Sequence, residues 1–563
     1  MNRRYRQHDV RRVIELDGVW DFAYLGAVDP QGIDLSTLAF PDRMAVPGCW
    51  DATPAYAGKR GLAAYRTRIF LPTAGPYRLV FNGVNNWCQV YLGGALLVNH
   101  SGGFTRFFAD FVNQAPGETD LVVLVDNAMN ADRSPQHLAY FDWYHYGGIA
   151  RPVELHSLGA TWINAVRVFT EDYQARRVNV TIDYGTLKYP DWFDLAILFD
   201  GITVLTERVS LEKASGSFSR TFSFPEAGLW SPESPTLHEV HVVLGQDDLR
   251  ERIGICQVQV SGPDILINGQ AQRLLGFCRH ESHPEFGCGL PDSLLVADVQ
   301  QLRDMNVNFV RGSHYPQDPR FLDLCDEAGI CVWNEVIGWQ HTATHLTDPH
   351  FLQAQHINAA EMTAMSFNHP SVILYGLLNE SLSNDPACRP GYESIIRVIR
   401  EIDPTRPVTY ASNHPLDDVC LDLIDVVSIN TYPGWYFGTI EEIPAALDHI
   451  MSHVDSTDSR GKPIIISEIG AEGIYGWRDW NEARWTEQFQ AHLHETVIRH
   501  LFSASKRACG LSLWLFSDFR TSEETGRALG RGRGFNNKGV VDEYRRPKQA
   551  YGVVKSLFHD LKK

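Results

Sequence analysis

The sequence has no long apolar run and no paired cysteine motif. No stretch of about 18 apolar residues occurs, so we expect no membrane-spanning segment. The basic start MNRRYRQHDVRRVIEL is not followed by an apolar run of signal-peptide length, so no secretory signal is expected. The 10 cysteines are scattered and form no CxxC pair. This distribution favours reduced thiols of a cytoplasmic protein over a disulfide framework.

Basic residues are in the minority, with 50 Lys and Arg against 68 Asp and Glu and a formal net charge of −18. Binding to a nucleic-acid backbone requires clustered Lys and Arg, so no nucleic-acid partner is expected. The negative charge favours solubility and says little about the fold. A small anionic substrate would require a local basic patch that acts against the overall field.

The sequence signatures of several enzyme classes are missing. No GxSxG elbow is present, so Ser-His-Asp hydrolysis lacks its usual sequence context. No HExxH motif is present either. The stretch RHESH at 279–283 offers two His and one Glu, but the spacing suggests no third metal ligand. Packing or sugar binding is the favoured interpretation of this stretch, and neither a metal site nor another cofactor is expected.

The first 259 residues read as strands without helical periodicity. Residues 1–157 contain short alternating runs separated by turn residues, which predicts a β-sandwich. The clearest of these runs are 65–72, 77–84, 87–94 and 121–127. Residues 158–259 continue in strands at 176–184, 193–200 and 238–245. A length of roughly a hundred residues suits one immunoglobulin-like sandwich.

From residue 260 to 563 short apolar runs alternate with amphipathic segments such as 293–305 and 484–502. The eight runs are 273–280, 308–311, 330–335, 372–380, 408–412, 426–430, 464–468 and 511–516. Eight strand-then-helix units predict a TIM (β/α)₈ barrel. An open doubly wound sheet is the alternative, but it would usually carry a Gly-rich phosphate turn after its first strand, and none follows RLLGFCRH.

Two glutamates stand at the ends of apolar runs that would face each other across such a barrel. Glu380 ends the fourth run and Glu468 ends the seventh. Barrel enzymes place their chemistry at the carboxyl ends of the strands, and glycoside hydrolysis requires two carboxyl groups around one bond. A solvated strand-end carboxylate is the alternative for either residue alone. Glu335, at the end of the third run, is a competing candidate.

Several segments, spread over nearly the whole chain, resemble glycoside hydrolase family 2, and most closely its β-glucuronidases. The segments are LDGVWDF (16–22), VPGCW (46–50), FDWYHYGGIARPVEL (141–155), GFCRHESH (276–283), NHPSVILYGLLNE (368–380) and PIIISEIGA (463–471). The resemblance implies a jelly-roll-like sugar-binding sandwich, an immunoglobulin-like sandwich and a catalytic barrel. It also implies a retaining exo-β-glycosidase that cleaves terminal β-D-glucuronides through a covalent glycosyl-enzyme and needs no cofactor.

The resemblance also implies roles for single residues. Glu380 would be the acid/base and Glu468 the nucleophile. Asn379 would bond the sugar 2-hydroxyl, and Tyr432 would touch the nucleophile. Taken alone, Tyr432 would be read as an aromatic that packs on the barrel rim. Further matched positions at the pocket are His314, Trp514, Asp142 and Tyr436.

The segment 526–540 is basic and has no acidic residue. A flexible solvated loop is one interpretation, and a clamp for a carboxylate is the other. In the resemblance, Asn536 and Lys538 match the Asn-x-Lys motif that contacts the C6 carboxylate. The family places an arginine just before this motif, where Gly532 stands here. The basic side chains that could contribute are Arg527, Arg531, Arg533 and Lys538, and the sequence does not decide between Arg531 and Arg533.

Two departures from the family pattern affect the predicted pocket. Pro433 replaces a typical tyrosine, and the segment 338–352 is short. A short segment suggests an entrance open to uronic-acid-capped oligosaccharides as well as to small β-uronides. A β-galacturonidase or dual uronidase is the near alternative, followed by a β-galactosidase and by a non-catalytic carbohydrate-binding protein. By analogy with the family we expect a homo-oligomer, either a dimer or a tetramer.

Overall fold

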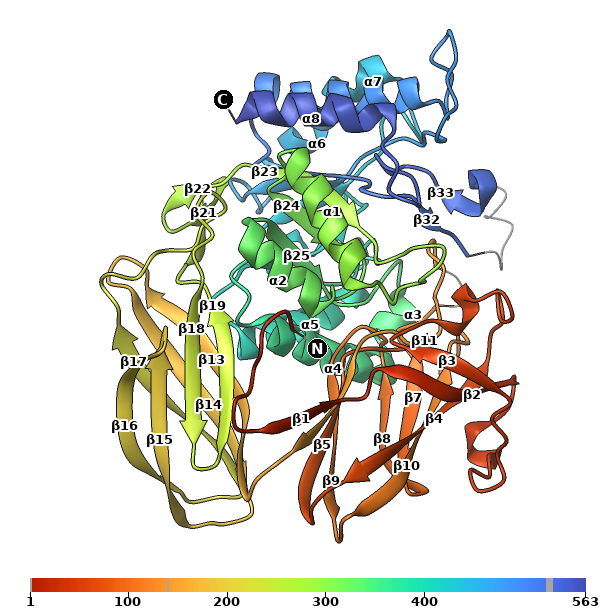
Figure 1. Cartoon of the computed structure of the whole chain (residues 1–563). Coiled ribbons are helices and arrows are strands. Elements are labelled where there is room, and N and C mark those ends of the chain that lie inside the picture. Colours follow the sequence, from red (N-terminus) through yellow and green to blue (C-terminus); the bar gives the residue numbers. More distant parts are fainter. Residues whose placement is uncertain (1–2, 139–140, 523–529, 563) are drawn as a thin grey trace.

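The computed structural model describes residues 3–138, 141–522 and 530–562, which form three parts (Figure 1). Two β-sandwiches lie side by side, one red to orange and the other yellow, and a helix-covered barrel lies above both of them. The amino-terminal half of the chain is therefore built from strands, and the carboxyl-terminal half alternates strands with helices.

The first sandwich packs two antiparallel sheets, with strand orders β1-β12-β5-β9 and β3-β2-β4-β10-β7-β8. Apolar side chains at every second position of a strand fall on one face, and here they meet in a core that includes Trp20, Tyr65 and Phe81. The strands are β1 (Arg12–Glu15), β2 (Gly18–Gly26), β3 (Asp42–Val46), β4 (Leu62–Leu71), β5 (Gly75–Phe81), β6 (Val84–Asn85), β7 (Trp87–Leu92), β8 (Ala95–Ser101), β9 (Phe107–Asn113), β10 (Gly117–Asp126), β11 (Gly148–Ile149) and β12 (Val153–Ser157).

The second sandwich pairs a three-stranded sheet, β13-β14-β17, with a four-stranded sheet, β16-β15-β18-β19. Buried and partly exposed residues alternate along β18, as expected for a strand with one face on the core. The strands are β13 (Thr161–Asp172), β14 (Arg177–Thr186), β15 (Asp191–Phe199), β16 (Ile202–Leu211), β17 (Ser215–Ser223), β18 (His238–Leu244) and β19 (Asp247–Ile253).

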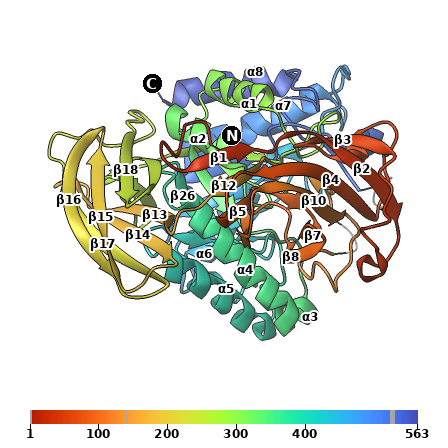
Figure 2. The ribbon, with the colours of Figure 1, turned by 60° about the horizontal axis from the view of Figure 1, so that its bottom comes forward.

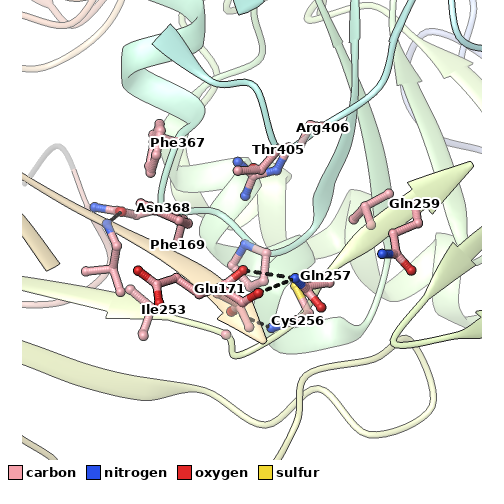
Figure 3. Close-up of a pocket in the computed structure, with 15 residues that line it drawn as sticks. Phe169, Glu171, Ile253, Cys256, Gln257, Gln259, Phe367, Asn368, Thr405 and Arg406 are labelled. Carbon is pink, nitrogen blue, oxygen red and sulfur yellow. Dashed lines mark hydrogen bonds between the residues drawn. The ribbon is translucent and has the colours of Figure 1, made fainter. Parts of the chain in front are cut away.

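A small antiparallel sheet links this sandwich to the barrel, and the sequence analysis missed it. Its strands are β20 (Val258–Ser261), β21 (Asp264–Ile267) and β22 (Gln270–Ala271). Beside it a cavity of about 370 Å³ lies between the sandwich, which contributes Phe169 and Glu171, and the barrel, which contributes Arg406 (Figure 3). The Gln257 side chain donates to the backbone oxygen of Glu171 over 2.9 Å, so its amide holds the segment before β20 against the sandwich.

The barrel is a ring of parallel strands in the order β27-β26-β25-β24-β23-β31-β30-β29-β28. The two terminal strands of this series, β27 and β28, are separated only by Tyr410, so the ring is nearly closed. The strands are β23 (Leu274–Arg279), β24 (Phe309–Gly312), β25 (Cys331–Glu335), β26 (Val372–Gly376), β27 (Val408–Thr409), β28 (Ala411–Ser412), β29 (Val427–Asn430), β30 (Ile464–Glu468) and β31 (Gly510–Leu513). A separate pair, β32 (Phe519–Arg520) and β33 (Phe535–Asn536), follows β31.

Helices cover the outside of the barrel, and local signals set their ends. Helix α2 begins at Pro319 and is capped by Asp318, whose side chain accepts a hydrogen bond from the Arg320 amide. It is followed by Gly329, whose φ of +69° suits glycine. The helices are α1 (Asp292–Asp304), α2 (Pro319–Ala328), α3 (Ala343–Leu346), α4 (Pro349–Ser366), α5 (Arg389–Ile402), α6 (Ile443–Val454), α7 (Glu487–Arg499) and α8 (Gln549–Leu561).

Helix α4 connects the barrel to both sandwiches. Figure 2 shows α4 and α5 between the two sandwiches on the face turned forward. Asn358 on α4 donates to the Ser101 oxygen of the first sandwich over 3.2 Å. Asn368, just after α4, donates to the Val166 oxygen of the second sandwich over 2.7 Å. The two sandwiches are therefore fixed against one side of the barrel.

The predicted fold class of two β-sandwiches and a TIM barrel is confirmed, and each of the eight apolar runs contains barrel strand. One detail of the prediction is wrong, because β26 ends at Gly376 and Glu380 lies beyond it rather than on the strand. The domain limits 1–157, 158–259 and 260–563 stay a prediction, with β20 across the second limit. Among the described residues, no helix combines the length and apolar character that crossing a bilayer requires.

Candidate active site

A cavity of about 530 Å³ lies where the barrel strands end, and most of the predicted site residues line it. The barrel and the segments that follow its strands contribute Glu380, Glu468, Tyr432, Tyr436, His314, Trp514, Arg531 and Asn536. The first sandwich contributes Asp142 and Trp143. The cavity is therefore built jointly by the barrel and by a sandwich that precedes it by more than a hundred residues in the chain.

Glu468, the last residue of β30, is almost fully buried at 3% exposure. Its Oε1 accepts a hydrogen bond from the Arg311 guanidinium over 2.7 Å. Its Oε2 accepts one from the Tyr432 hydroxyl over 2.7 Å. Hydrogen bonds from charged or strong donors favour the ionised form of a carboxylate. The position of this side chain is therefore determined by one donor on each oxygen.

Glu380 reaches the same cavity from the segment that follows β26. Leu378 and Glu380 have φ of +49° and +48°, a left-handed conformation that costs a non-glycine residue roughly 1–2 kcal/mol. The Glu380 carboxylate accepts from the side-chain amides of Gln340 over 3.0 Å and Asn430 over 3.1 Å. In the described part of the chain Glu380 forms no ion pair, and both of these side-chain donors are neutral amides.

Arg311, the third residue of β24, connects the groups around both carboxylates. Besides Glu468, it donates to both carboxylate oxygens of Glu335 over 3.0 and 3.1 Å and to Asn379 Oδ1 over 2.7 Å. Asn430 donates to the same Asn379 oxygen over 3.0 Å. The two candidate catalytic residues are thereby joined by one buried hydrogen-bonded network.

Glu335, the competing candidate, is fully buried and does not line the cavity. Burial raises its pKa to about 7, against the opposing effect of Arg311. His314 Nδ1 lies 3.1 Å from Glu335 Oε1, and burial together with Arg311 lowers the His314 pKa well below its ordinary value. Glu335 therefore acts as a partner of Arg311 and His314 behind the cavity wall.

The pKa of Glu468 depends on its surroundings in opposing ways. Burial raises it to about 8, Arg311 lowers it, Glu380 raises it, and the Tyr432 hydrogen bond lowers it. Because Glu380 contributes to the increase, the charges of the two carboxylates influence each other.

A second charged cluster surrounds Arg531 at the cavity wall. The Arg531 guanidinium donates to both oxygens of Asp142 over 2.8–2.9 Å and to Glu472 Oε1 over 2.8 Å. Lys538 donates to the same Glu472 oxygen over 2.8 Å and to the Tyr436 hydroxyl over 3.2 Å. Asn536 donates to Asp142 over 3.0 Å. Two cations are thus held beside the cavity by two acids.

The structure separates the arginines that the sequence left undecided. Arg531 lines the cavity, whereas Arg533 donates to Glu543 over 3.0 Å and to Asn537 over 2.8 Å. Arg527 lies outside the described residues. Lys538 is almost fully buried and lies directly behind Tyr436, whose side chain is 60% exposed at the rim. Arg531 is therefore the arginine adjacent to the predicted Asn-x-Lys motif.

The family model described as "Glycosyl hydrolases family 2, TIM barrel domain" matches residues 258–563, which is more than half of the chain. The chain is a member of glycoside hydrolase family 2. This family 2 hydrolase is 29% identical to the β-glucuronidase of Paenibacillus borealis, over 98% of this chain and 97% of that protein. It is 28% identical to the rat β-glucuronidase, over 97% of this chain and 91% of that protein.

Solved structures of family 2 enzymes superpose on the whole chain. The β-galacturonidase from Eisenbergiella tayi bound to galacturonate has a TM-score of 0.92 and 34% identity, covering 100% of this chain and 99% of its own. The β-glucuronidase from Bifidobacterium dentium complexed with coumarin-3-O-glucuronide has a TM-score of 0.87 and 26% identity, covering 98% and 97%. The family 2 fold extends over both sandwiches and the barrel.

The other predicted site residues of this hydrolase lie around the carboxylate pair. Trp514 and His314 stack with ring centroids 5.2 Å apart and form one wall. Asn379 is fully buried, and its Nδ2 has no hydrogen-bond partner among the described residues. Pro433, which replaces a typical tyrosine of the family, lies between Tyr432 and the tight turn at Gly434. The predicted residues thus converge on one region.

Sequence reasoning missed Arg311, Glu472, Trp143 and Gln340, which line the cavity or hold the groups around it. Arg311 ends the run at 308–311, so its place after a buried strand was an available signal. For Glu472 the only signal was a second acid four residues after Glu468. The contacts of Arg311 and Glu472 are made with residues far away in the chain, and no local sequence pattern indicates such contacts.

The RHESH stretch does not converge into a metal site. His280 lines the cavity, while Glu281 forms an ion pair with Arg151 of the first sandwich over 2.9 Å. Groups with metal-like spacing among the described residues occur elsewhere, and the buried one includes Asp323, which is paired with Arg3. The stretch therefore contributes one residue to the cavity lining and an ion pair between the sandwich and the barrel.

Proposed function

We propose that this enzyme is a retaining exo-β-uronidase that hydrolyses terminal β-D-glucuronides, with Glu468 as nucleophile and Glu380 as acid/base. The observation that carries the proposal is a single cavity with a carboxylate pair, Arg531 at its wall and the Lys538 cation behind Tyr436. A uronide has the matching groups, because its glycosidic bond at C1 and the C6 carboxylate attached at C5 are held at a fixed separation by one sugar ring.

The unequal partners of the two carboxylates support the assignment of roles. Glu468 receives a cationic donor and a hydroxyl, both at 2.7 Å, which favour the negative charge required of a nucleophile. Glu380 receives amide donors only, which stabilise a negative charge less than a guanidinium does, so Glu380 is the better candidate for the proton donor. In that role it would protonate the leaving oxygen and then activate the water that releases the sugar.

Asn379 is suited to recognise the 2-hydroxyl of the sugar. Its Oδ1 is occupied by Arg311 and Asn430, which fixes the orientation of the amide. Its Nδ2 is buried and has no described partner, so it can donate to a substrate oxygen next to the carbon that Glu468 attacks. Hydrogen bonds to the 2-hydroxyl strengthen in the transition state of glycoside hydrolysis.

The cluster around Arg531 is suited to bind the C6 carboxylate. Two of the three ammonium protons of Lys538 are used by Glu472 and Tyr436, which leaves one for a ligand. Asn536 uses one amide proton on Asp142 and keeps a second. A neutral C6 alcohol would not offset the cations in the same way, so a β-galactoside is the weaker candidate.

Galacturonide hydrolysis is a second candidate, because the Eisenbergiella tayi β-galacturonidase is 34% identical over the whole chain whereas the β-glucuronidases reported above are 26–29% identical. Nitrophenyl β-D-glucuronide, galacturonide and galactoside, measured side by side, test both candidates. We expect one or both uronides to exceed the galactoside in kcat/KM by at least about 100-fold, as unpaired buried charge would require. A preference for the galactoside, or no turnover of any of the three, would contradict the proposal.

The carboxylate contact is tested by Lys538→Ala. Truncating one partner of a buried charge pair costs about 2–5 kcal/mol, so kcat/KM on the uronide should fall by roughly 30-fold or more. Activity on a neutral glycoside should fall much less. The matched control is Lys555→Ala, because Lys555 on α8 forms an exposed pair with Asp304 on α1. Equal losses on charged and neutral substrates would remove the clamp assignment.

We further propose that residues 1–157, 158–259 and 260–563 are the three domains and that the enzyme acts in the cytoplasm as a dimer or tetramer. All ten cysteines are free in the structure, which suits a reducing compartment. Light scattering coupled to size exclusion measures the oligomeric state directly. A monomer at micromolar concentration would contradict that part of the proposal.

A further inference from the structure

Glu472 lies four residues after Glu468, is fully buried, and does not line the cavity. A single oxygen, Oε1, accepts from Lys538 Nζ and from Arg531 Nη1, each over 2.8 Å. The other oxygen, Oε2, accepts from the backbone amide of Asn537 over 2.6 Å. One carboxylate therefore binds both cations and the loop that carries them.

The cations would not adopt this arrangement without a common anion. Both lie 2.8 Å from the same oxygen, so they are no more than twice that distance apart, with Lys538 almost fully buried and the Arg531 side chain 17% exposed at the cavity wall. Like charges at such separation repel strongly when they are buried. Against the effect of burial, Lys538 and Arg531 hold the pKa of Glu472 below its ordinary value. The acid thus remains ionised between them.

Glu472 also connects the two ends of the site. It shares the short segment after β30 with Glu468, which is held by Arg311 and Tyr432. The distance from the attacking carboxylate to the cations is therefore set by four residues of buried backbone. A uronide requires such a fixed distance, because its reacting carbon and its C6 carboxylate are parts of one rigid ring.

We propose that Glu472 is a positioning residue for uronide recognition, which holds Lys538 and Arg531 together at a fixed distance from Glu468. The inference rests on the proposed function. Glu472 itself does not touch the sugar. Its removal should weaken the binding of the sugar carboxylate while leaving the carboxylate pair at the other end in place.

The test compares wild type, Glu472→Gln and Glu472→Ala on a nitrophenyl uronide and on the matching uronamide, in which the C6 group is a neutral amide. For Glu472→Ala we expect KM for the uronide to rise at least tenfold, kcat to change less than about threefold, and uronamide kinetics to stay near wild type. Glu472→Gln keeps an acceptor for the cations, so its KM for the uronide should lie between those of wild type and Glu472→Ala. Calorimetric titration with free glucuronate and galacturonate should show the same order of affinities.

Glu543→Ala is the matched control, because Glu543 is a buried acid that holds Arg533, the arginine directed away from the cavity. It should leave the ratio of uronide to uronamide activity unchanged. Equal losses on uronide and uronamide for Glu472→Ala, or unchanged uronide KM and uronate affinity, would overturn the inference. If wild type itself turns over no uronide, the proposed function fails first, which separates the two failures.

Discussion

At the scale of single residues, Glu468 and Glu380 differ in the donors that surround them, and azide can distinguish their roles. We expect Glu468→Ala to lower kcat by at least about 1,000-fold and, with azide, to form the α-uronosyl azide. Glu380→Ala should still react with a dinitrophenyl uronide, whose leaving group needs no acid, and with azide should form the β-uronosyl azide. Product stereochemistry is read by NMR, and the reverse pattern would exchange the two assignments.

The coupled carboxylates also predict a pH dependence. The pKa of Glu468 is raised to about 8 by burial, with Glu380 adding to the effect, so Glu468 carries a proton below that pH and ionises above it. Because the nucleophile attacks in its ionised form, kcat/KM for a nitrophenyl uronide should rise as the pH increases toward about 8. A dinitrophenyl uronide, whose leaving group needs no acid, should show the same rise. A profile that is flat or falls over this range for both substrates would show that Glu468 does not titrate there.

The sequence indicated the carboxylates that line the cavity better than the residues that hold the groups around it. Glu380 and Glu468 end apolar runs, and the residues at the carboxyl ends of barrel strands lie at the mouth of the barrel. Arg311 and Glu472 act through partners 157 and 66 positions away, respectively. Such pairs become neighbours only when the ring of strands closes, so no local spacing could have indicated them.

At the scale of elements, the strands of the barrel were predictable because each is a short, fully buried apolar run. The end of β26 was not, because Leu377 and Leu378 are as apolar as the strand although the backbone turns into the left-handed region there. The small sheet β20-β21-β22 was missed for a related reason. Its strands have two to four residues, too few for alternation to be visible in the sequence.

The short segment 338–352 leads to a prediction about leaving groups. It holds only the four-residue α3 and the start of α4, and the rim residue Tyr436 is 60% exposed. We expect uronic-acid-capped oligosaccharides to be cleaved with kcat/KM at least equal to that of nitrophenyl uronide. Chromatography of the released uronic acid measures both rates. A tenfold or larger preference for the aryl uronide would contradict an open entrance.

At the scale of the whole molecule, Arg151 joins the first sandwich to the barrel. It is buried, and it donates to Glu281 over 2.9 Å and to the Pro316 oxygen over 2.7 Å. Removing one partner of a buried ion pair costs about 3–5 kcal/mol, so Arg151→Ala should lower the urea midpoint for loss of activity. Arg68→Ala, at an exposed pair with Asp120, should change it little. Similar midpoints for both variants would contradict this role.

The contact of Asp142 with Arg531 spans 389 positions of the chain. During translation, Asp142 is made with the first sandwich. Arg531, whose guanidinium pairs with Asp142, is made only near the end of the chain. Nascent or prematurely terminated chains therefore contain Asp142 without Arg531, and we expect them not to hydrolyse uronides. Catalytic competence should appear abruptly during synthesis, as the last strand and the loop after it leave the exit tunnel.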